Sequence, residues 1–190
     1  MSDCQSELRQ RILDTALTMG LESSWDAVRL RDVAGQLEIT LADVYTCYTQ
    51  KDDLVEAFFD RADSALLSLP ISDNPEASVP ERLHRAMFTW LDALAGHQTL
   101  IPQMLGYKLE PLHVHLQVAG ITRISRTVQW FMEAAGINTP NPLRAVEEFA
   151  LTTIYLATFA CWINDSSESQ QRSRNFLARK LNVAARIRSI

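Results

Sequence analysis

Apolar residues recur every three or four positions through nearly every long segment of this 190-residue chain. Leu8, Ile12 and Ala16 share one face of the first such segment, and Leu83 and Met87 share one face of a later one. This spacing is that of an α-helix with one buried side, whereas no segment shows the alternation of a half-buried strand. The sequence therefore predicts an all-α protein.

A proline-rich stretch divides the chain. Residues 70–80 read PISDNPEASVP, and three prolines among polar residues are typical of a linker. Before it we expect helices at 7–21, at 29–37, from residue 40 onward and at 50–69; after it the spacing indicates five or six more. The sequence thus predicts a small helical module over 1–69, a linker over 70–80 and a larger helical bundle over 81–190.

One register runs without gaps through residues 12–58. LRDVA at 30–34 occupies the second expected helix, ITLADVYTCY at 39–48 the third, and QKDDL at 50–54 opens the fourth. In this register the segment resembles the DNA-binding domain of the TetR family of bacterial regulators. The resemblance implies a TetR-like fold, in which a helix-turn-helix module binds double-stranded DNA and the C-terminal bundle binds a small ligand and forms a homodimer.

The resemblance also places candidate DNA contacts. Matched residue by residue, Thr40 caps the third helix, Tyr45 is the aromatic residue that faces DNA, Tyr48 is an inward aromatic residue, and Lys51 is the basic residue at the start of the fourth helix. Hydroxyl groups would donate hydrogen bonds, and cations would neutralise phosphates. The predicted DNA-binding residues are Arg29, Arg31, Thr40, Leu41, Tyr45, Thr46 and Lys51.

Acidic residues oppose this function. Residues 1–55 contain ten acidic and five basic residues, so the whole net charge of −5 resides in this segment. Because carboxylates near the phosphate backbone weaken binding, we expect moderate to weak affinity for DNA. Asp43 is either a capping residue, three positions after Thr40, or an acceptor for a cytosine amino group.

Large apolar residues are abundant after residue 80, and they would suit a small apolar ligand. The predicted ligand-binding residues are His84, Trp90, Met104, His113, Trp130 and Tyr155. For each aromatic residue the alternative is ordinary core packing. Small residues at 150, 153, 157 and 160 favour a close helix contact, either within the chain or between two chains.

The end of the chain resembles a second family. Its aromatic-rich helix, the W-x-x-D-S-S break at 162–167 and FL-x-R at 176–179 are similar to the C-terminal part of the ubiquinone-biosynthesis accessory family, and DLVEAFFDRAD at 53–63 is similar to its early helices. This resemblance implies the alternative function: a protein that binds lipid or isoprenoid and keeps the TetR fold without tight DNA binding.

The last segment, 168–190, has six basic residues, one acidic residue and an apolar strip. Such a helix either packs in a dimer or core with a solvated basic face, or lies on a membrane surface.

Few features of the sequence favour other classes of protein. Three widely spaced cysteines predict neither a disulfide framework nor a zinc site, and with no signal-like N-terminus they favour the cytoplasm. No nucleophile, phosphate-loop or metalloprotease motif is present, and His113 with His115 is a weak metal pattern. We therefore expect no catalytic residue, no metal and no cofactor. The sequence favours a ligand-responsive, DNA-binding transcriptional regulator of the TetR type.

Overall fold

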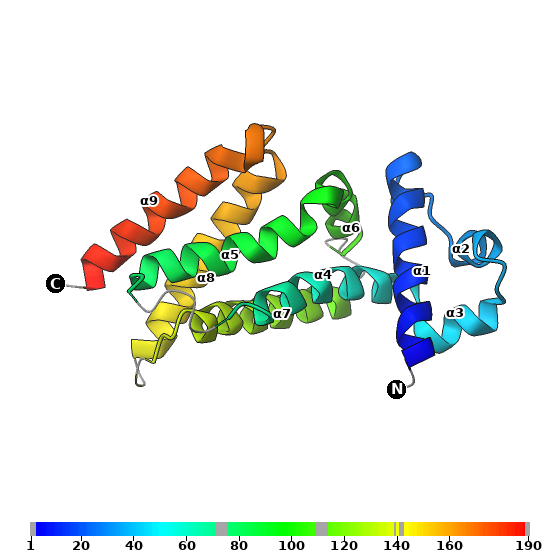
Figure 1. The fold of residues 1–190 in the computed structure, drawn as a ribbon, viewed down its shortest axis with the longest axis horizontal. Coiled ribbons are helices and arrows are strands. Elements are labelled where there is room, and N and C mark those ends of the chain that lie inside the picture. Colours follow the sequence, from blue (N-terminus) through cyan, green and yellow to red (C-terminus); the bar gives the residue numbers. More distant parts are fainter. Residues whose placement is uncertain (1–2, 71–75, 109–113, 139, 141–142, 189–190) are drawn as a thin grey trace. The chain divides into compact units, whose positions relative to one another are not determined.

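The computed structural model describes residues 3–70, 76–108, 114–138, 140 and 143–188. All regular elements in this part of the chain are helices, as predicted (Figure 1). They are α1 (Asp3–Glu22), α2 (Leu30–Gln36), α3 (Leu41–Cys47), α4 (Lys51–Leu67), α5 (Val79–Leu94), η1 (Ala95–Leu100), α6 (Ile101–Lys108), α7 (Val114–Ala134), α8 (Leu143–Ile163), η2 (Glu168–Gln170) and α9 (Gln171–Arg188).

The helices form two compact units. The first contains residues 1–61 and 96–110, and the second contains 62–95 and 111–190, so α4 contributes residues to both. Packing therefore groups 62–69 with the second unit and 96–110 with the first. The sequence-based division into a module over 1–69, a linker over 70–80 and a bundle over 81–190 stays a prediction.

In the first unit, α1, α2 and α3 pack against one another (Figure 1). Each buries the apolar face that its helical spacing predicts, because the polar backbone groups are satisfied within the helix and only the apolar side chains need cover. Ile12 and Leu17 of α1, Val33 of α2 and Val44 of α3 are buried. This small core holds the two short helices at a fixed angle to α1.

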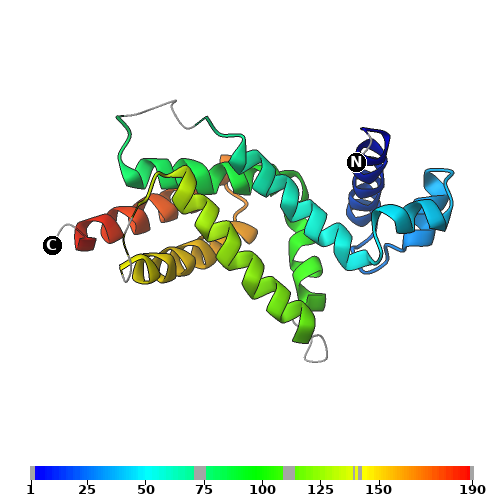
Figure 2. The same ribbon diagram turned by 90° about the horizontal axis from the view of Figure 1, so that it is seen from below.

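In the second unit, α9 packs against α5 and α8, and α7 packs against α5 and α8 (Figure 2). The centre is aromatic. The Trp90 ring lies 6.4 Å from Phe131, 5.6 Å from Tyr155 and 6.0 Å from Phe159, with edge-to-face geometry in each pair. Such pairs add to the stabilisation from area burial.

A cluster of hydrogen bonds around Asp165 joins the end of α8 to the start of α9. Asp165 accepts hydrogen bonds from the backbone N–H and hydroxyl groups of Ser167 and Ser173, at 2.6–3.0 Å. Burial acts to raise the pKa of Asp165, but these hydrogen bonds to the charged form outweigh it and lower the pKa to about 2. The sequence break at 162–167 is thus a capped turn between two helices.

Candidate DNA-binding surface and ligand-binding core

The turn between α2 and α3 contains a strained residue. Glu38 has φ of 54°, in the left-handed region that favours glycine. The backbone N–H of Ile39 donates to the carbonyl of Ala34 at 3.0 Å, and that of Glu38 donates to Gly35 at 3.2 Å. These bonds close the turn tightly and set the direction in which α3 begins.

Thr40 and Asp43 form a capping box at the start of α3. The Asp43 N–H donates to the Thr40 hydroxyl at 3.1 Å, and the Asp43 carboxylate accepts from the Thr40 N–H at 2.9 Å and from its hydroxyl at 2.6 Å. These hydrogen bonds lower the pKa of Asp43. Of the two roles left open by the sequence, the structure shows the cap.

A second acid is also used as a cap. The Asp53 carboxylate accepts from the Thr49 N–H at 2.8 Å, the Thr49 hydroxyl at 2.6 Å and the Gln50 N–H at 3.2 Å. Burial acts to raise its pKa, but the hydrogen bonds prevail and lower it. Two of the acids around α3 therefore stabilise helix starts, where the helix dipole favours negative charge.

The outer face of α3 is exposed and nearly free of charge. Leu41 is 55% exposed and Tyr45 is 66% exposed, while Val44 and Cys47 face the core. Thr46 is exposed, and its hydroxyl donates to the Asp43 carbonyl at 2.7 Å. Tyr48 is buried, as predicted, and its hydroxyl donates to the Arg9 carbonyl at 3.0 Å.

Lys51 is held inside the first unit. Its Nζ donates to the carbonyl oxygens of Trp25 and Asp26 and lies 5.2 Å from the centre of the Trp25 ring. Burial lowers its pKa, against the opposite effect of Asp26. The lysine thus supports the segment that precedes α2, an arrangement that sequence reasoning missed because it depends on contacts 25 or more residues apart.

The other predicted cations lie at the solvent. Arg29 directly precedes α2 and is exposed. Arg31 is exposed and lies 3.2 Å from Asp32, a surface pair that contributes little to stability. Both arginines are therefore exposed in the same helix-turn-helix segment as four other predicted DNA-binding residues: Thr40, Leu41, Tyr45 and Thr46.

A buried polar cluster surrounds Asp63 in the second unit. Its Oδ1 accepts from Trp90 Nε1 at 2.7 Å and from the Thr127 hydroxyl at 3.3 Å, and its Oδ2 accepts from Arg123 Nη2 at 3.0 Å. Asp63 is only 7% exposed. Tyr155, in contact with Trp90, is also buried, and burial together with the Asp63 charge raises its pKa.

This cluster unites two of the predicted ligand-binding residues, Trp90 and Tyr155. Sequence reasoning missed Asp63, Arg123 and Thr127, because no local pattern distinguishes a buried acid at one turn of a helix from a solvated one. The hydrogen bonds of this cluster join residues that are 27 to 64 positions apart in the sequence.

The remaining predicted ligand residues lie elsewhere. His84 stacks on Phe88, with ring centres 5.0 Å apart, and its Nε2 lies 3.1 Å from the Arg174 carbonyl oxygen. Trp130 is 39% exposed. Met104 is buried in the first unit, so its side chain belongs to that core. His113 lies outside the described residues.

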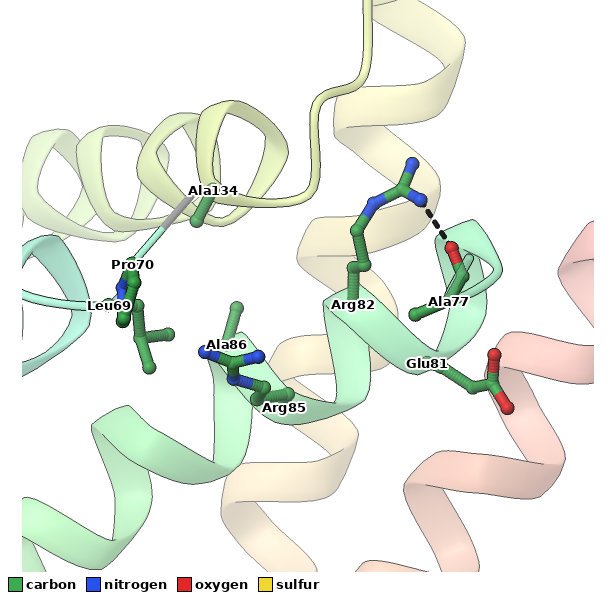
Figure 3. Close-up of a pocket in the computed structure, with 8 residues that line it drawn as sticks. All are labelled: Leu69, Pro70, Ala77, Glu81, Arg82, Arg85, Ala86 and Ala134. Atoms are coloured by element: carbon green, nitrogen blue, oxygen red, sulfur yellow. Dashed lines mark hydrogen bonds between the residues drawn. The ribbon is translucent and has the colours of Figure 1, made fainter. Parts of the chain in front are cut away.

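A shallow pocket of about 230 Å³ opens between the end of α4, the start of α5 and the end of α7 (Figure 3). Arg82 crosses it: its Nε donates to the Ala135 carbonyl at 2.8 Å and its Nη1 donates to the Ala77 carbonyl. Arg85 lines the same pocket together with the apolar side chains of Leu69 and Ala86. None of the predicted ligand-binding residues lines it.

An exposed apolar stripe runs along α8. Leu143 (60% exposed), Val146 (65%), Phe149 (75%) and Leu156 (42%) recur at helical spacing. On the same helix, the residues at 150, 153, 157 and 160 are small and exposed as well. By length and composition alone, α8 also meets the requirements of a helix that crosses a membrane.

Metal ligands do not gather in the described part of the chain: no three His, Cys, Asp or Glu residues there lie close enough to hold an ion.

The two short helices, the capped α3 with an exposed outer face and the helical second unit together define a helix-turn-helix protein. The TetR transcriptional regulator from Nitrosomonas europaea ATCC 19718 has a similar crystal structure, with a TM-score of 0.83 and 41% sequence identity over 94% of this chain and 98% of that one. This chain belongs to the TetR family of transcriptional regulators.

Other comparisons agree on the fold. A TetR transcriptional regulator from Rhodococcus sp. RHA1 has a TM-score of 0.67 and 18% identity, over 94% of this chain and 95% of that one. A regulatory protein of the tetR family from Rhodococcus RHA1 has a TM-score of 0.50 and 19% identity, over 98% and 97%. The COQ9 family matches residues 149–188, in line with the second resemblance. No curated protein matches the chain.

Proposed function

We propose that this protein is a non-enzymatic, ligand-responsive transcriptional regulator that binds double-stranded DNA as a homodimer. The exposed outer face of α3 carries the proposal. Leu41, Tyr45 and Thr46 face solvent on a helix whose start is fixed by a capping box. A helix presented in this way fits the major groove. The capping hydrogen bonds lower the pKa of Asp43 and Asp53 and so keep both carboxylates ionised. The negative charge of the module therefore still opposes DNA, and we expect moderate to weak affinity.

The direct test is fluorescence anisotropy with the purified protein and the DNA upstream of its own gene. We expect affinity to fall steeply as salt rises from about 50 to about 200 mM, because phosphate contacts release counterions. Arg29→Ala should weaken binding and reduce the salt slope by about one. The matched control is Arg172→Ala, an exposed arginine of the second unit. Equal salt slopes for Arg29→Ala and wild type would exclude the proposed contact.

For dimerisation, the support is the stripe on α8. An exposed row of Leu143, Val146, Phe149 and Leu156 is larger than the scattered apolar residues of a monomer surface. Small residues along the same helix allow a second helix to approach closely. A second copy of the chain would cover the stripe and remove its apolar area from water.

For ligand response, the support is the aromatic cluster around Trp90 and Tyr155. An apolar small molecule that separates these rings would disturb Asp63, which accepts a hydrogen bond from Trp90 and lies on α4. Because α4 contributes residues to both units, a ligand that favours one position of α4 changes the affinity for DNA. Quenching of tryptophan fluorescence by candidate ligands, lost in Tyr155→Ala, would test this step.

The COQ9 match favours a second candidate, a lipid or isoprenoid-binding accessory protein. It covers α8 from Phe149 and all of α9. On α9, Val183 and Ile187 are exposed beside basic residues, an arrangement that suits a membrane surface. Flotation with anionic vesicles, compared between wild type and Ile187→Asp, tests this candidate. Lipid in native mass spectra together with no DNA binding at low salt would favour it over the regulator.

A further inference from the structure

The outer face of α3 lacks every side chain that recognises a purine by paired hydrogen bonds. The helix reads LADVYTC, without Arg, Lys, Asn or Gln. Guanine is usually recognised by Arg or Lys and adenine by Asn or Gln. Neither kind of direct readout is available to this helix.

Apart from the Tyr45 hydroxyl, the polar side chains of α3 are engaged within the helix or with its N-cap. The Asp43 carboxylate and the Thr40 hydroxyl bond to each other, and the Thr46 hydroxyl donates to the Asp43 carbonyl. The Thr46 hydroxyl therefore already has an acceptor within the helix. Cytosine recognition by Asp43 would require opening the capping box.

What remains exposed is apolar. Leu41 and Tyr45 are four residues apart and therefore lie on the same side of the helix. Ala42 and Thr46, also four residues apart and exposed, add two methyl groups beside them. In the major groove, the C5-methyl group of thymine is the one apolar feature that distinguishes a base pair.

We propose that α3 reads its operator through thymine methyl groups, with Leu41 as the principal contact and Tyr45, Ala42 and Thr46 beside it. The proposal rests on the DNA-binding function above and adds the chemistry of the bases. The Tyr45 hydroxyl and the guanidinium groups of Arg29 and Arg31 are left to contact phosphates, which position the helix without specifying sequence.

The test begins with selection of binding sites from a random double-stranded library by the full-length protein. The best duplex is then remade with deoxyuridine in place of each thymidine in turn, which removes only the methyl group. We expect one or two positions in each half-site at which this change weakens binding about three- to fourfold, the value of one buried methyl group. Replacing cytosine by 5-methylcytosine at those positions in a weaker duplex should restore part of the affinity.

The matching protein variant is Leu41→Ala. Leu41 is exposed, so the variant should fold, which circular dichroism will check. It should lose most of the preference for the thymidine duplex over the deoxyuridine duplex, because the principal contact to the methyl group is gone. Leu21→Ala, an exposed leucine on α1, should keep the wild-type preference.

Two results would overturn the inference, and they are distinguishable. Wild-type protein that binds both kinds of duplex equally refutes methyl readout and leaves the regulator function standing. A selection without enrichment, together with no binding at low salt, refutes the regulator function and the inference with it.

Discussion

The buried Asp63 cluster offers the sharpest test of how the second unit is held together. Asp63→Ala removes an acceptor for Trp90 and Thr127 and the carboxylate opposite Arg123, whose side chain is 11% exposed. Breaking a buried ion pair by removing one partner costs about 3–5 kcal/mol, because a desolvated charge loses its counterpart. We therefore expect Asp63→Ala to lower the free energy of unfolding by that amount.

The double variant Asp63→Leu/Arg123→Met should be much less destabilised than the sum of the costs of Asp63→Leu alone and Arg123→Met alone. Replacing both members of a buried pair by apolar groups of similar volume is often close to neutral. The assay is urea unfolding followed by circular dichroism, read as a double-mutant cycle. Additive single costs would refute the idea that the carboxylate and the guanidinium stabilise each other.

An exposed pair of the same type provides the control. Arg61 Nη1 lies 2.6 Å from Asp14, whose side chain is 62% exposed. Because water already solvates such charges, Asp14→Ala should cost less than about 1 kcal/mol. A cost similar to that of Asp63→Ala would mean that burial is not the reason for the large effect.

Three further predictions concern a turn, a helix junction and the α8 stripe. Glu38→Gly should stabilise the protein by about 0.5–1 kcal/mol, since glycine adopts positive φ without steric cost. Glu38→Ala should not stabilise it, and thermal unfolding of the two variants and the wild type will show which is the most stable. Asp165→Asn should lower the stability by about 1–2 kcal/mol at neutral pH. The pKa of Asp165 is lower in the folded state, so its contribution is present above about pH 4 and lost towards about pH 2, where variant and wild type should converge in acid titrations. Phe149→Asp should convert a dimer into a monomer in sedimentation velocity, whereas Glu168→Gln, at an exposed position outside the stripe, should leave the dimer intact; a dimeric Phe149→Asp variant would contradict the proposed seam.

Helical spacing predicted the elements well because each helix buries one regular face. The boundary at Thr40 was also predictable, since a capping box is made by residues three positions apart. The contacts of Lys51 were not, because its partners are backbone carbonyls of Trp25 and Asp26; its predicted contact to DNA stays a prediction. Main-chain acceptors have no sequence signature, so a lysine in the pattern of a phosphate ligand and one that supports a loop look alike.

The second unit shows the same limit of prediction from the sequence. Trp90 and Tyr155 are in contact in the buried core, whereas Trp130 is partly exposed, and the ligand-binding role of all three stays a prediction. On an apolar helix such as α8, the sequence alone does not say which side is covered, because that depends on where α7 and α9 pack. The exposed stripe therefore emerges only from the structure.

Helix α4 also sets a scale for communication along the chain. Lys51 and Asp63 lie on this one continuous helix, and at 1.5 Å per residue they are about 18 Å apart along its axis. A tilt of about 5° pivoting at Asp63 would carry the Lys51 end sideways by about 1.6 Å. That is about half the length of a hydrogen bond, so a small tilt of α4 is enough to misalign the groups at its far end.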